Sequence, residues 1–355
     1  MSLRTPLARL VAATAVLGAS GATLHAQTAP VHLTPVATIG CGMCGGPEEF
    51  GAVMAVAVGP DGVAVADRDA PHVRVFGADG SLRWVAGPEG DGPGELRLPS
   101  ALTLGPAGVA VVDMRGAHLV RLGPDGGERD RIRLGGFPLA ASFAPESEAL
   151  DVSLADFRAM RATVARWEGQ GGWRTLHDGL DELALRPPGE PPLYFSLARA
   201  GDGGFAIGIG VETYRVLWFD AQGAPVREVI RDVPRTPRSD AEMDEERARR
   251  SAAAARLGAA EGGRPTPPEV DRYRLHFRMD ALRFDELGRL WVRTDRAPEG
   301  TVFDVFDRSG GFVGEVRVDA PVDAFDVGHG HLAGVVPGAF DVASVRLWRV
   351  EPGSP

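Results

Sequence analysis

Short apolar runs recur along the chain and are separated by clusters of Gly, Pro and Asp. The pattern is most regular in residues 55–89, AVAVGPDGVAVADRDAPHVRVFGADGSLRWVAGPE, and returns 46 residues later in residues 101–135 as ALTLGPAGVAVVDMRGAHLVRLGPDGGERDRIRLG. Each copy holds four runs of Val, Leu, Ala and Ile, which predicts four β-strands joined by tight turns. A period in the forties with four strands per unit is typical of a β-propeller blade.

Six such units are predicted from the first turn of each one. These turns fall at residues 59–62, 105–108, 144–147, 201–204, 285–288 and 328–330. The third unit, Phe137 to His177, is poorly patterned, and seven blades are the alternative because the turns at Asp202 and Glu286 are about two repeats apart. We therefore expect an all-β, six-bladed propeller.

The two ends of the chain predict how the ring closes. The strand-like segment His32 to Ile39 stands alone before the first blade, whereas the last unit has three strands, Val322 to Val327, His331 to Val336 and Val345 to Val350. Pairing the N-terminal strand with the last unit completes the sixth blade. This closure leaves no long unpaired strand edge.

A helical insertion is predicted between blades four and five, at about residues 235–270. From Ser239 to Leu257 the chain reads SDAEMDEERARRSAAAARL, in which Ser239 and Glu242 form a capping box and Gly258 follows as a stop signal. The apolar side of this helix is thin, so we expect it to lie on a surface. Connections between blades share a face with the loops between second and third strands, and we expect the helix to cover the mouth of the central channel on that face.

The first 26 residues have the pattern of a secretory signal peptide. Arg4 and Arg9 come before an apolar run from Leu10 to Leu17, and cleavage is expected after Ala26. Residues 27–355 then form a propeller that is exported to the periplasm or the outside of the cell, and no later apolar run is long enough to span a membrane. The exported part has 36 basic and 48 acidic residues, which disfavours nucleic acid and anionic membranes as partners.

Matched positions in the first two units carry a family resemblance. Asp67 matches Asp113, and His72 matches His118. The string DRDAPHVRVFGADG resembles the NHL-type repeat of six-bladed propellers, and Glu95 in GDGPGELRLPSAL resembles the lead-in to that repeat. The resemblance implies the fold but no single activity, because NHL-like propellers include binding proteins, sensors and a few enzymes.

Cys41 and Cys44, in GCGMCGG, are the two cysteines of the chain. The oxidising environment of an exported protein favours their oxidation to a disulfide. Haem attachment would need a His after Cys44, where Gly45 stands, and structural zinc would need two further ligands. A redox site is the remaining alternative, although it would need the CxxC at a helix N-terminus.

Loops on the face with the insertion supply the candidate ligand-binding residues, because sites on scaffolds are usually built from such loops. The candidates are Asp67, Asp69, His72, Asp113, Arg115, His118, Glu212, Tyr214, Asp295 and Arg296. The alternative for the repeated Asp residues is capping of turn amides, and for the repeated His residues structural hydrogen bonding.

The sequence contains no constellation that fixes a reaction. It has neither Lys nor Asn, no GxSxG elbow and no HExxH helix, so we predict no catalytic residue, no metal site and no cofactor. We expect a monomeric, non-catalytic propeller that binds a small molecule, a peptide or a protein. The alternative is a metal-dependent propeller enzyme with its site in the central channel, either a lyase using His72 and His118 or a lactonase-like hydrolase, which would normally need Asn.

Overall fold

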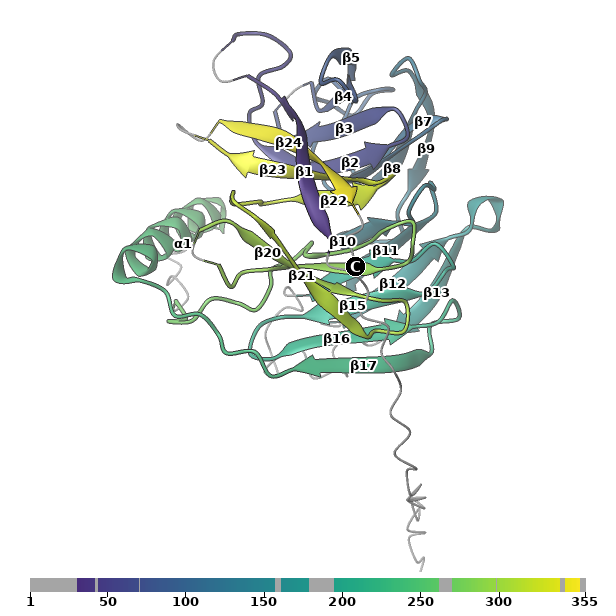
Figure 1. The fold of residues 1–355 in the computed structure, drawn as a ribbon. Coiled ribbons are helices and arrows are strands. Elements are labelled where there is room, and N and C mark those ends of the chain that lie inside the picture. The colour runs from purple at the N-terminus through teal and green to yellow at the C-terminus, as the bar shows by residue number, and fades with distance from the viewer. Residues whose placement is uncertain are drawn as a thin grey trace, which may run out of the picture.

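Six four-stranded antiparallel sheets form a ring in the computed structural model (Figure 1). The structure describes residues 31–41, 44–69, 71–156, 161–178, 195–261, 270–297, 299–338 and 342–351. The predicted signal peptide lies outside these residues. Within the described part, no helix is both long and apolar enough to cross a membrane.

In blades one to five, the four strands follow the chain order from the channel outward. Blade one contains β2 (Val53–Gly59), β3 (Gly62–Asp67), β4 (Val73–Gly77) and β5 (Leu82–Ala86). Blade two contains β6 (Pro99–Gly105), β7 (Gly108–Asp113), β8 (His118–Leu122) and β9 (Glu128–Arg133). Blade three contains β10 (Phe137–Phe143), β11 (Leu150–Asp156), β12 (Arg161–Trp167) and β13 (Trp173–Asp178).

Blades four and five follow the same plan, and blade six takes its outermost strand from the start of the chain. Blade four contains β14 (Phe195–Arg199), β15 (Phe205–Ile209), β16 (Tyr214–Phe219) and β17 (Pro225–Arg231). Blade five contains β18 (Leu282–Phe284), β19 (Leu290–Thr294), β20 (Thr301–Phe306) and β21 (Phe312–Val318). Blade six contains β22 (Phe325–Gly328), β23 (His331–Pro337), β24 (Ala343–Glu351) and β1 (His32–Ile39). The six-bladed prediction is confirmed.

The burial of each strand follows its position in the blade. Every residue of β3 and β7 is buried, because neighbouring blades cover both faces of an inner strand, and both strands accordingly read as continuous apolar runs. The outer strand β17 is mostly exposed and carries the charged residues Arg227, Glu228 and Arg231. The core is therefore a ring of apolar clusters between successive blades.

The ring closes as the sequence predicts. The strand β1 pairs antiparallel with β24, in a register that runs from His32 opposite Glu351 to Ile39 opposite Val345. Ile39 is buried in an apolar cluster with Val345 of the same blade and strands of blade one. The first strand of the chain is thus the outermost strand of the last blade.

Two faces of the ring differ in their loops. We call the face with the tight turns between first and second and between third and fourth strands the turn face. The opposite face, which we call the helix face, carries the loops between second and third strands and the connections between blades. The Cys41–Cys44 segment and the helical insertion lie in such connections, so both belong to the helix face.

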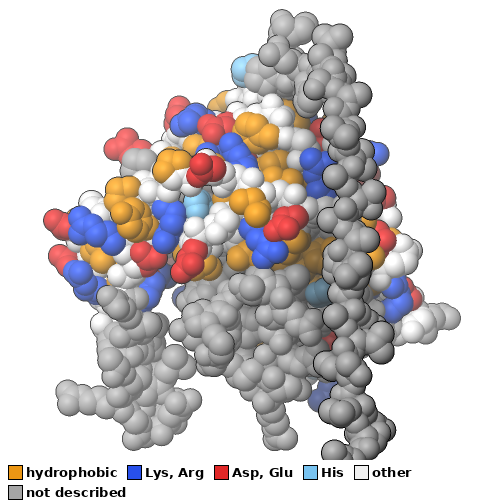
Figure 2. Space-filling view, turned by 90° about the horizontal axis from the view of Figure 1, so that it is seen from below, with side chains coloured by type: hydrophobic (Ala, Val, Ile, Leu, Met, Phe, Trp, Pro, Cys, Tyr) orange, Lys and Arg blue, Asp and Glu red, His pale blue; other side chains and the backbone are white. Residues whose placement is uncertain are grey.

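The insertion contains one helix, α1 (Asp240–Glu261), between β17 and β18. Its first turn is the predicted capping box, since the Glu242 N–H donates to Ser239 Oγ and the Ser239 N–H donates to Glu242 Oε2. The helix continues past the predicted stop at Gly258, because the cost of one glycine, about 1 kcal/mol, is met by good helix formers on both sides. At the left of Figure 2, where α1 lies, acidic and Arg side chains stand side by side.

A disulfide joins Cys41 and Cys44, as predicted, in the connection between β1 and β2. The Cys41 N–H also donates to the carbonyl oxygen of Glu48, which closes the loop by a hydrogen bond as well. We expect replacement of both cysteines by Ser to lower the free energy of unfolding by about 2 kcal/mol or less, because so short a loop loses little unfolded-state entropy on closure. Chemical denaturation with and without reductant measures the loss; a loss well above this, or two free thiols in non-reduced mass spectrometry, would contradict the expectation.

Candidate functional site

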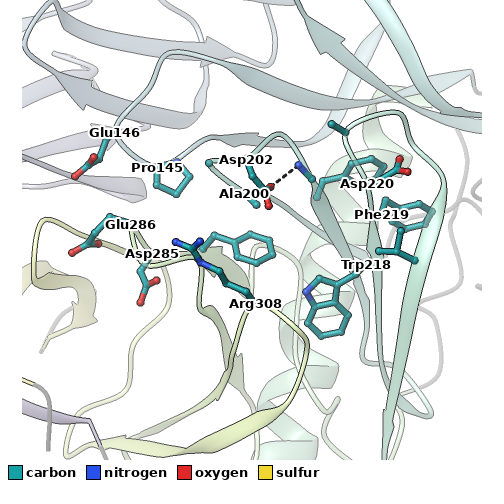
Figure 3. Close-up of a pocket in the computed structure, with 17 residues that line it drawn as sticks. Pro145, Glu146, Ala200, Asp202, Trp218, Phe219, Asp220, Asp285, Glu286 and Arg308 are labelled. Carbon is teal, nitrogen blue, oxygen red and sulfur yellow. Dashed lines mark hydrogen bonds between the residues drawn. The ribbon is translucent and has the colours of Figure 1, made fainter. Parts of the chain in front are cut away.

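A cavity of about 630 Å³ opens on the turn face where blades three, four and five meet (Figure 3). We call it the turn-face pocket. Ligand pockets usually measure about 300 to 1,000 Å³, so its volume suits a small organic molecule. Its polar lining consists of Glu146, Asp202, Asp220, Asp285, Glu286 and Arg308.

Asp202 and Asp220 belong to the two turns of blade four. Asp202 Oδ1 accepts a hydrogen bond from the Gly204 N–H at 2.9 Å, and Asp220 Oδ1 accepts from the N–H groups of Gln222 and Ala224, both at 2.9 Å. These are the turn caps that Asp commonly forms. In the part of the chain that the structure describes, Oδ2 of each carboxylate has no hydrogen-bond or ion-pair partner.

The two acidic residues that blade five contributes differ in how many hydrogen bonds they accept. Asp285 is fully bonded, because its oxygens accept from the backbone of Leu287 and from the side chains of Arg289 and Trp291. Glu286 accepts one hydrogen bond, from the Gly330 N–H of blade six at 2.9 Å. Asp202 and Asp220 of blade four and Glu286 of blade five can therefore each accept a further hydrogen bond.

Aromatic side chains form the apolar wall of the turn-face pocket. Phe205 and Phe219 stack in parallel, with ring centroids 4.6 Å apart. Trp218 packs against Phe306 of blade five, is 6% exposed, and its Nε1–H has no hydrogen-bond partner among the described residues. In Figure 3 the nitrogen-bearing edge of Trp218 faces the space beside Arg308. A buried N–H without an acceptor is costly, so this edge is a place where a ligand oxygen would be favourable.

Arg308 is the basic residue of the pocket lining. Its Nε–H donates to the Leu287 carbonyl oxygen at 2.6 Å, which holds the side chain across the turn between β18 and β19. Within the described residues, its terminal nitrogens have no ion pair.

A buried ion cluster from blade three holds the two turns of blade four in place. Arg166 makes a two-point contact with Asp151 at 2.7 Å for each bond, and it also donates to the carbonyl oxygens of Gly203 and Ala221. Arg199 binds the same Asp151 carboxylate. Burial lowers the pKa of Arg199, and the Asp151 charge opposes that shift. The turns that carry Asp202 and Asp220 are therefore fixed by a buried guanidinium.

The central channel is narrow and reaches the turn face beside this pocket. It holds about 40 Å³ and is mostly apolar toward blades one to three, where Thr103 and Ser142 are polar, whereas Arg283 and Asp326 lie on its other side. Burial raises the pKa of Asp326. At its mouth Glu146 of blade three contacts His329 of blade six, with 3.2 Å between Oε1 and Nδ1. Two opposite blades thus meet over the channel.

On the helix face, Asp67 and His72 of blade one serve the structure of their own loop. Asp67 is fully buried and accepts from the N–H groups of Gly51 and Ala52, both at 2.9 Å. His72 Nδ1 lies 2.9 Å from the Asp67 carbonyl oxygen, while its Nε2 has no partner among the described residues. Asp69 is exposed and lies 3.7 Å from Arg68, on the rim of an open groove.

Asp113, Arg115 and His118 occupy the same loop of blade two. Asp113 is buried and accepts from the N–H groups of Leu98 and Gly116, at 2.9 and 3.2 Å. Arg115 is exposed, and His118 is half-buried. Both repeated Asp residues therefore tie the second strand of their blade to the incoming connection, which is the turn-capping alternative; a ligand-binding role for these residues stays a prediction.

Tyr214 and Arg296 meet around Asp304 where blades four and five pack together. The Asp304 carboxylate contacts Arg231 and Arg296, at 2.5 Å each. Tyr214 is fully buried, and this burial, together with the Asp304 charge, raises the pKa of its phenol well above the usual range. A further contact of 3.2 Å links Arg296 to Glu315.

Glu212 and Asp295 are linked through His276 in the same region. His276 Nε2 lies 3.3 Å from the Glu212 carbonyl oxygen, and the Asp295 N–H donates to the His276 carbonyl oxygen at 2.9 Å. Burial lowers the pKa of His276. The Asp295 carboxylate contacts Arg278 at 3.2 Å.

The predicted residues thus fall into three groups, in blade one, in blade two and between blades four and five. The helix is tied to the third group, since Glu242 of α1 contacts Arg274, and Arg274 donates to the Ala297 carbonyl oxygen at 2.9 Å. Among the described residues, no group of three or more His, Cys, Asp and Glu could hold a metal ion. In the sequence, the turns at Asp202 and Glu286 mark blades four and five, and no local pattern distinguishes their carboxylates as a site.

No family model matches the chain, and no curated protein matches it. Among solved structures, a Bacteroides fragilis protein named as a candidate exported protein has a TM-score of 0.52 at 10% identity, over 90% of this chain and 95% of that one. Regucalcin, a calcium-binding protein of Agrobacterium tumefaciens, gives 0.48 at 12% identity, over 86% and 92% of the two chains. A gluconolactonase of Xanthomonas campestris gives 0.49 at 12% identity, over 85% and 87%. Identities of this size show the fold alone, so NHL-type membership stays a resemblance.

Proposed function

We propose that this protein is an exported, non-catalytic propeller that binds a small organic ligand in the turn-face pocket. The observation that carries the proposal is the combination of a cavity of about 630 Å³ with a Trp218 N–H that is buried in its wall and has no acceptor among the described residues. Pockets of this kind bind through an apolar wall and a few directed polar groups. The N-terminal pattern of charged, apolar and small residues supports export.

The lining chemistry favours binding over turnover. The described lining residues include no hydroxyl, thiol, imidazole or amine side chain, so carboxylates are the groups there that could act as a nucleophile or a general base. The available carboxylates of blade four already accept hydrogen bonds from the backbone, which suits fixed charges better than groups that exchange protons.

A metal-dependent enzyme with its site in the central channel is the alternative function. The free space there, about 40 Å³, exceeds what one water or ion needs, and Asp326 supplies a carboxylate. Metal analysis of the purified protein separates the two functions. Stoichiometric zinc or calcium would favour the enzyme, whereas a metal-free protein that binds organic ligands would favour the binding function.

Binding at the turn-face pocket is tested by filling it. We expect ligands found by thermal-shift screening of a small-molecule library to lose at least tenfold in affinity in the Ala221→Trp variant, because the indole would occupy the pocket beside Asp220. The matched control is Ala78→Trp, which places the same side chain on the exposed turn between β4 and β5 of blade one. Titration calorimetry measures both variants.

A third variant tests the helix face predicted from the sequence. Replacement of residues 239–268 by a short Gly/Ser linker removes α1 and should leave these affinities unchanged, because the pocket lies on the opposite face. If ligands bind Ala221→Trp normally but fail to bind the linker variant, the site lies on the helix face. That result would contradict the proposal.

A further inference from the structure

The turn-face pocket has a strong excess of negative charge. Five carboxylates and one guanidinium line it, and the Asp285 carboxylate is fully bonded within its own turn and to Trp291. Four carboxylates from turns of three blades therefore face one basic side chain, Arg308. An uncharged or anionic ligand would leave this excess uncompensated in a partly enclosed site, where charges interact more strongly than in water.

Asp202 and Asp220 are the carboxylates best placed to bind a ligand. Each uses Oδ1 to cap its turn and keeps Oδ2 without a partner in the described part of the chain. The turns themselves are held by the Arg166 guanidinium, which donates to Gly203 and Ala221 on either side. Each of the two turns thus presents one fixed acceptor, which suits a ligand that carries N–H donors.

The end of the pocket nearest the central channel adds two more hydrogen-bond acceptors. Glu146 contacts His329, and Glu286 accepts from the Gly330 N–H, so the turn between β22 and β23 lies between the two carboxylates. Each of these carboxylates makes one such contact, which leaves the other oxygen able to accept from a ligand that extends toward the channel.

Apolar side chains form the rest of the wall, and they favour an organic cation over a metal ion. A Ca²⁺ ion would require six to eight oxygen ligands, whereas Trp218, Val226 and Phe284 add apolar surface to the wall. Ring surfaces attract organic cations and pack against their apolar bodies, and Trp is the strongest of the aromatic residues in this respect. The unpartnered Trp218 N–H would in turn donate to an oxygen of the ligand.

We propose that the ligand of the turn-face pocket is an organic cation, an amine or guanidine on an aromatic or aliphatic body, bound by Asp202 and Asp220. This inference rests on the proposed function of the same pocket. The probes are pairs that share a body and differ in charge: tyramine with 4-hydroxyphenylacetate, benzylamine with benzoate, and putrescine with succinate. Titration calorimetry should show the amine of at least one pair binding tenfold or more tightly than its carboxylate, and more weakly as salt is raised.

Charge-neutralising variants locate the binding. Asp202→Asn and Asp220→Asn keep the Oδ1 acceptor that caps each turn and remove the charge, so each should weaken amine binding about tenfold, the loss typical of one hydrogen bond to a charged group. Asp125→Asn is the matched control, because Asp125 caps the corresponding turn of blade two by accepting from the Gly127 N–H at 3.0 Å. It should leave the affinity unchanged.

The outcomes separate this inference from the proposed function. Equal or tighter binding of the carboxylates, binding of Ca²⁺ in place of amines, or no binding by any amine at millimolar concentration would overturn the organic cation. If neutral or anionic ligands from the library nonetheless lose affinity in Ala221→Trp, the pocket still binds ligands and only the inference about their charge fails. Amine binding that is unchanged in both Asn variants would also overturn it.

Discussion

Replacing Asp151 by Ala is expected to lower the free energy of unfolding by about 3 to 5 kcal/mol, the usual cost of breaking a buried ion pair. Asp151 is fully buried, and its carboxylate binds Arg166 and Arg199, both of which are buried as well. The variant leaves two guanidinium groups in the protein interior without their counter-charge. Urea denaturation of the wild-type protein and the variant measures the difference.

The control for this prediction is an exposed carboxylate on the neighbouring blade. Asp130 contacts Arg121 at 3.0 Å, and its side chain is 47% exposed. Asp130→Ala should cost at most about 1 kcal/mol, because solvent screens such pairs. Similar losses in the free energy of unfolding for the two variants would show that burial does not strengthen the contribution of the Asp151 cluster to stability. Amine affinity should also fall in Asp151→Ala, because Arg166 then loses the partner that orients it toward Gly203 and Ala221.

The second large effect concerns ring closure. A chain that begins at residue 40 lacks β1, so β24 loses its antiparallel partner from Val345 to Glu351, and the buried Ile39 is lost from the cluster shared by blades six and one. An exposed, unpaired strand edge favours association with other chains. We expect this shortened protein to unfold at a markedly lower temperature or to aggregate, because one buried Ile alone contributes about 1.5 to 3 kcal/mol of a total near 5 to 15.

The matched control begins at residue 31 and keeps the whole of β1. Thermal unfolding followed by circular dichroism, together with size-exclusion chromatography, compares the two proteins. A shortened protein that melts at the temperature of the control and stays monodisperse would contradict the role given to β1.

Much of the fold follows from local patterns in the sequence. Blades one and two repeat their apolar runs and turns almost position by position, and the lone segment from His32 to Ile39 needed a partner that the three-stranded last blade could supply. Blade three was the weakest prediction, because buried charges replace apolar residues in it: Asp151 in β11 and Arg166 in β12 interrupt the pattern that marks other inner strands.

The turn-face pocket could not be predicted in the same way. It arises where turns from three blades, far apart in sequence, fail to fill the space between them. Its key residues carry no distinctive local signal either. Asp220 caps its turn as Asp307 caps the corresponding turn of blade five. Asp202 accepts from the N–H two residues further on, as Asp79 and Asp125 do in blades one and two. The repeated residues Asp67 and Asp113, which stand out in the sequence, form the same structural hydrogen bond in the loops of blades one and two.

Ligand binding in the turn-face pocket, where blades three, four and five meet, can be observed directly. A crystal structure of the protein with the tightest-binding amine tests it most directly. We predict density for the amine nitrogen within hydrogen-bond distance of the Asp202 or Asp220 carboxylate, with the body of the ligand against Trp218. Ligand density on the helix face or in the central channel, with the turn-face pocket empty, would contradict the claim.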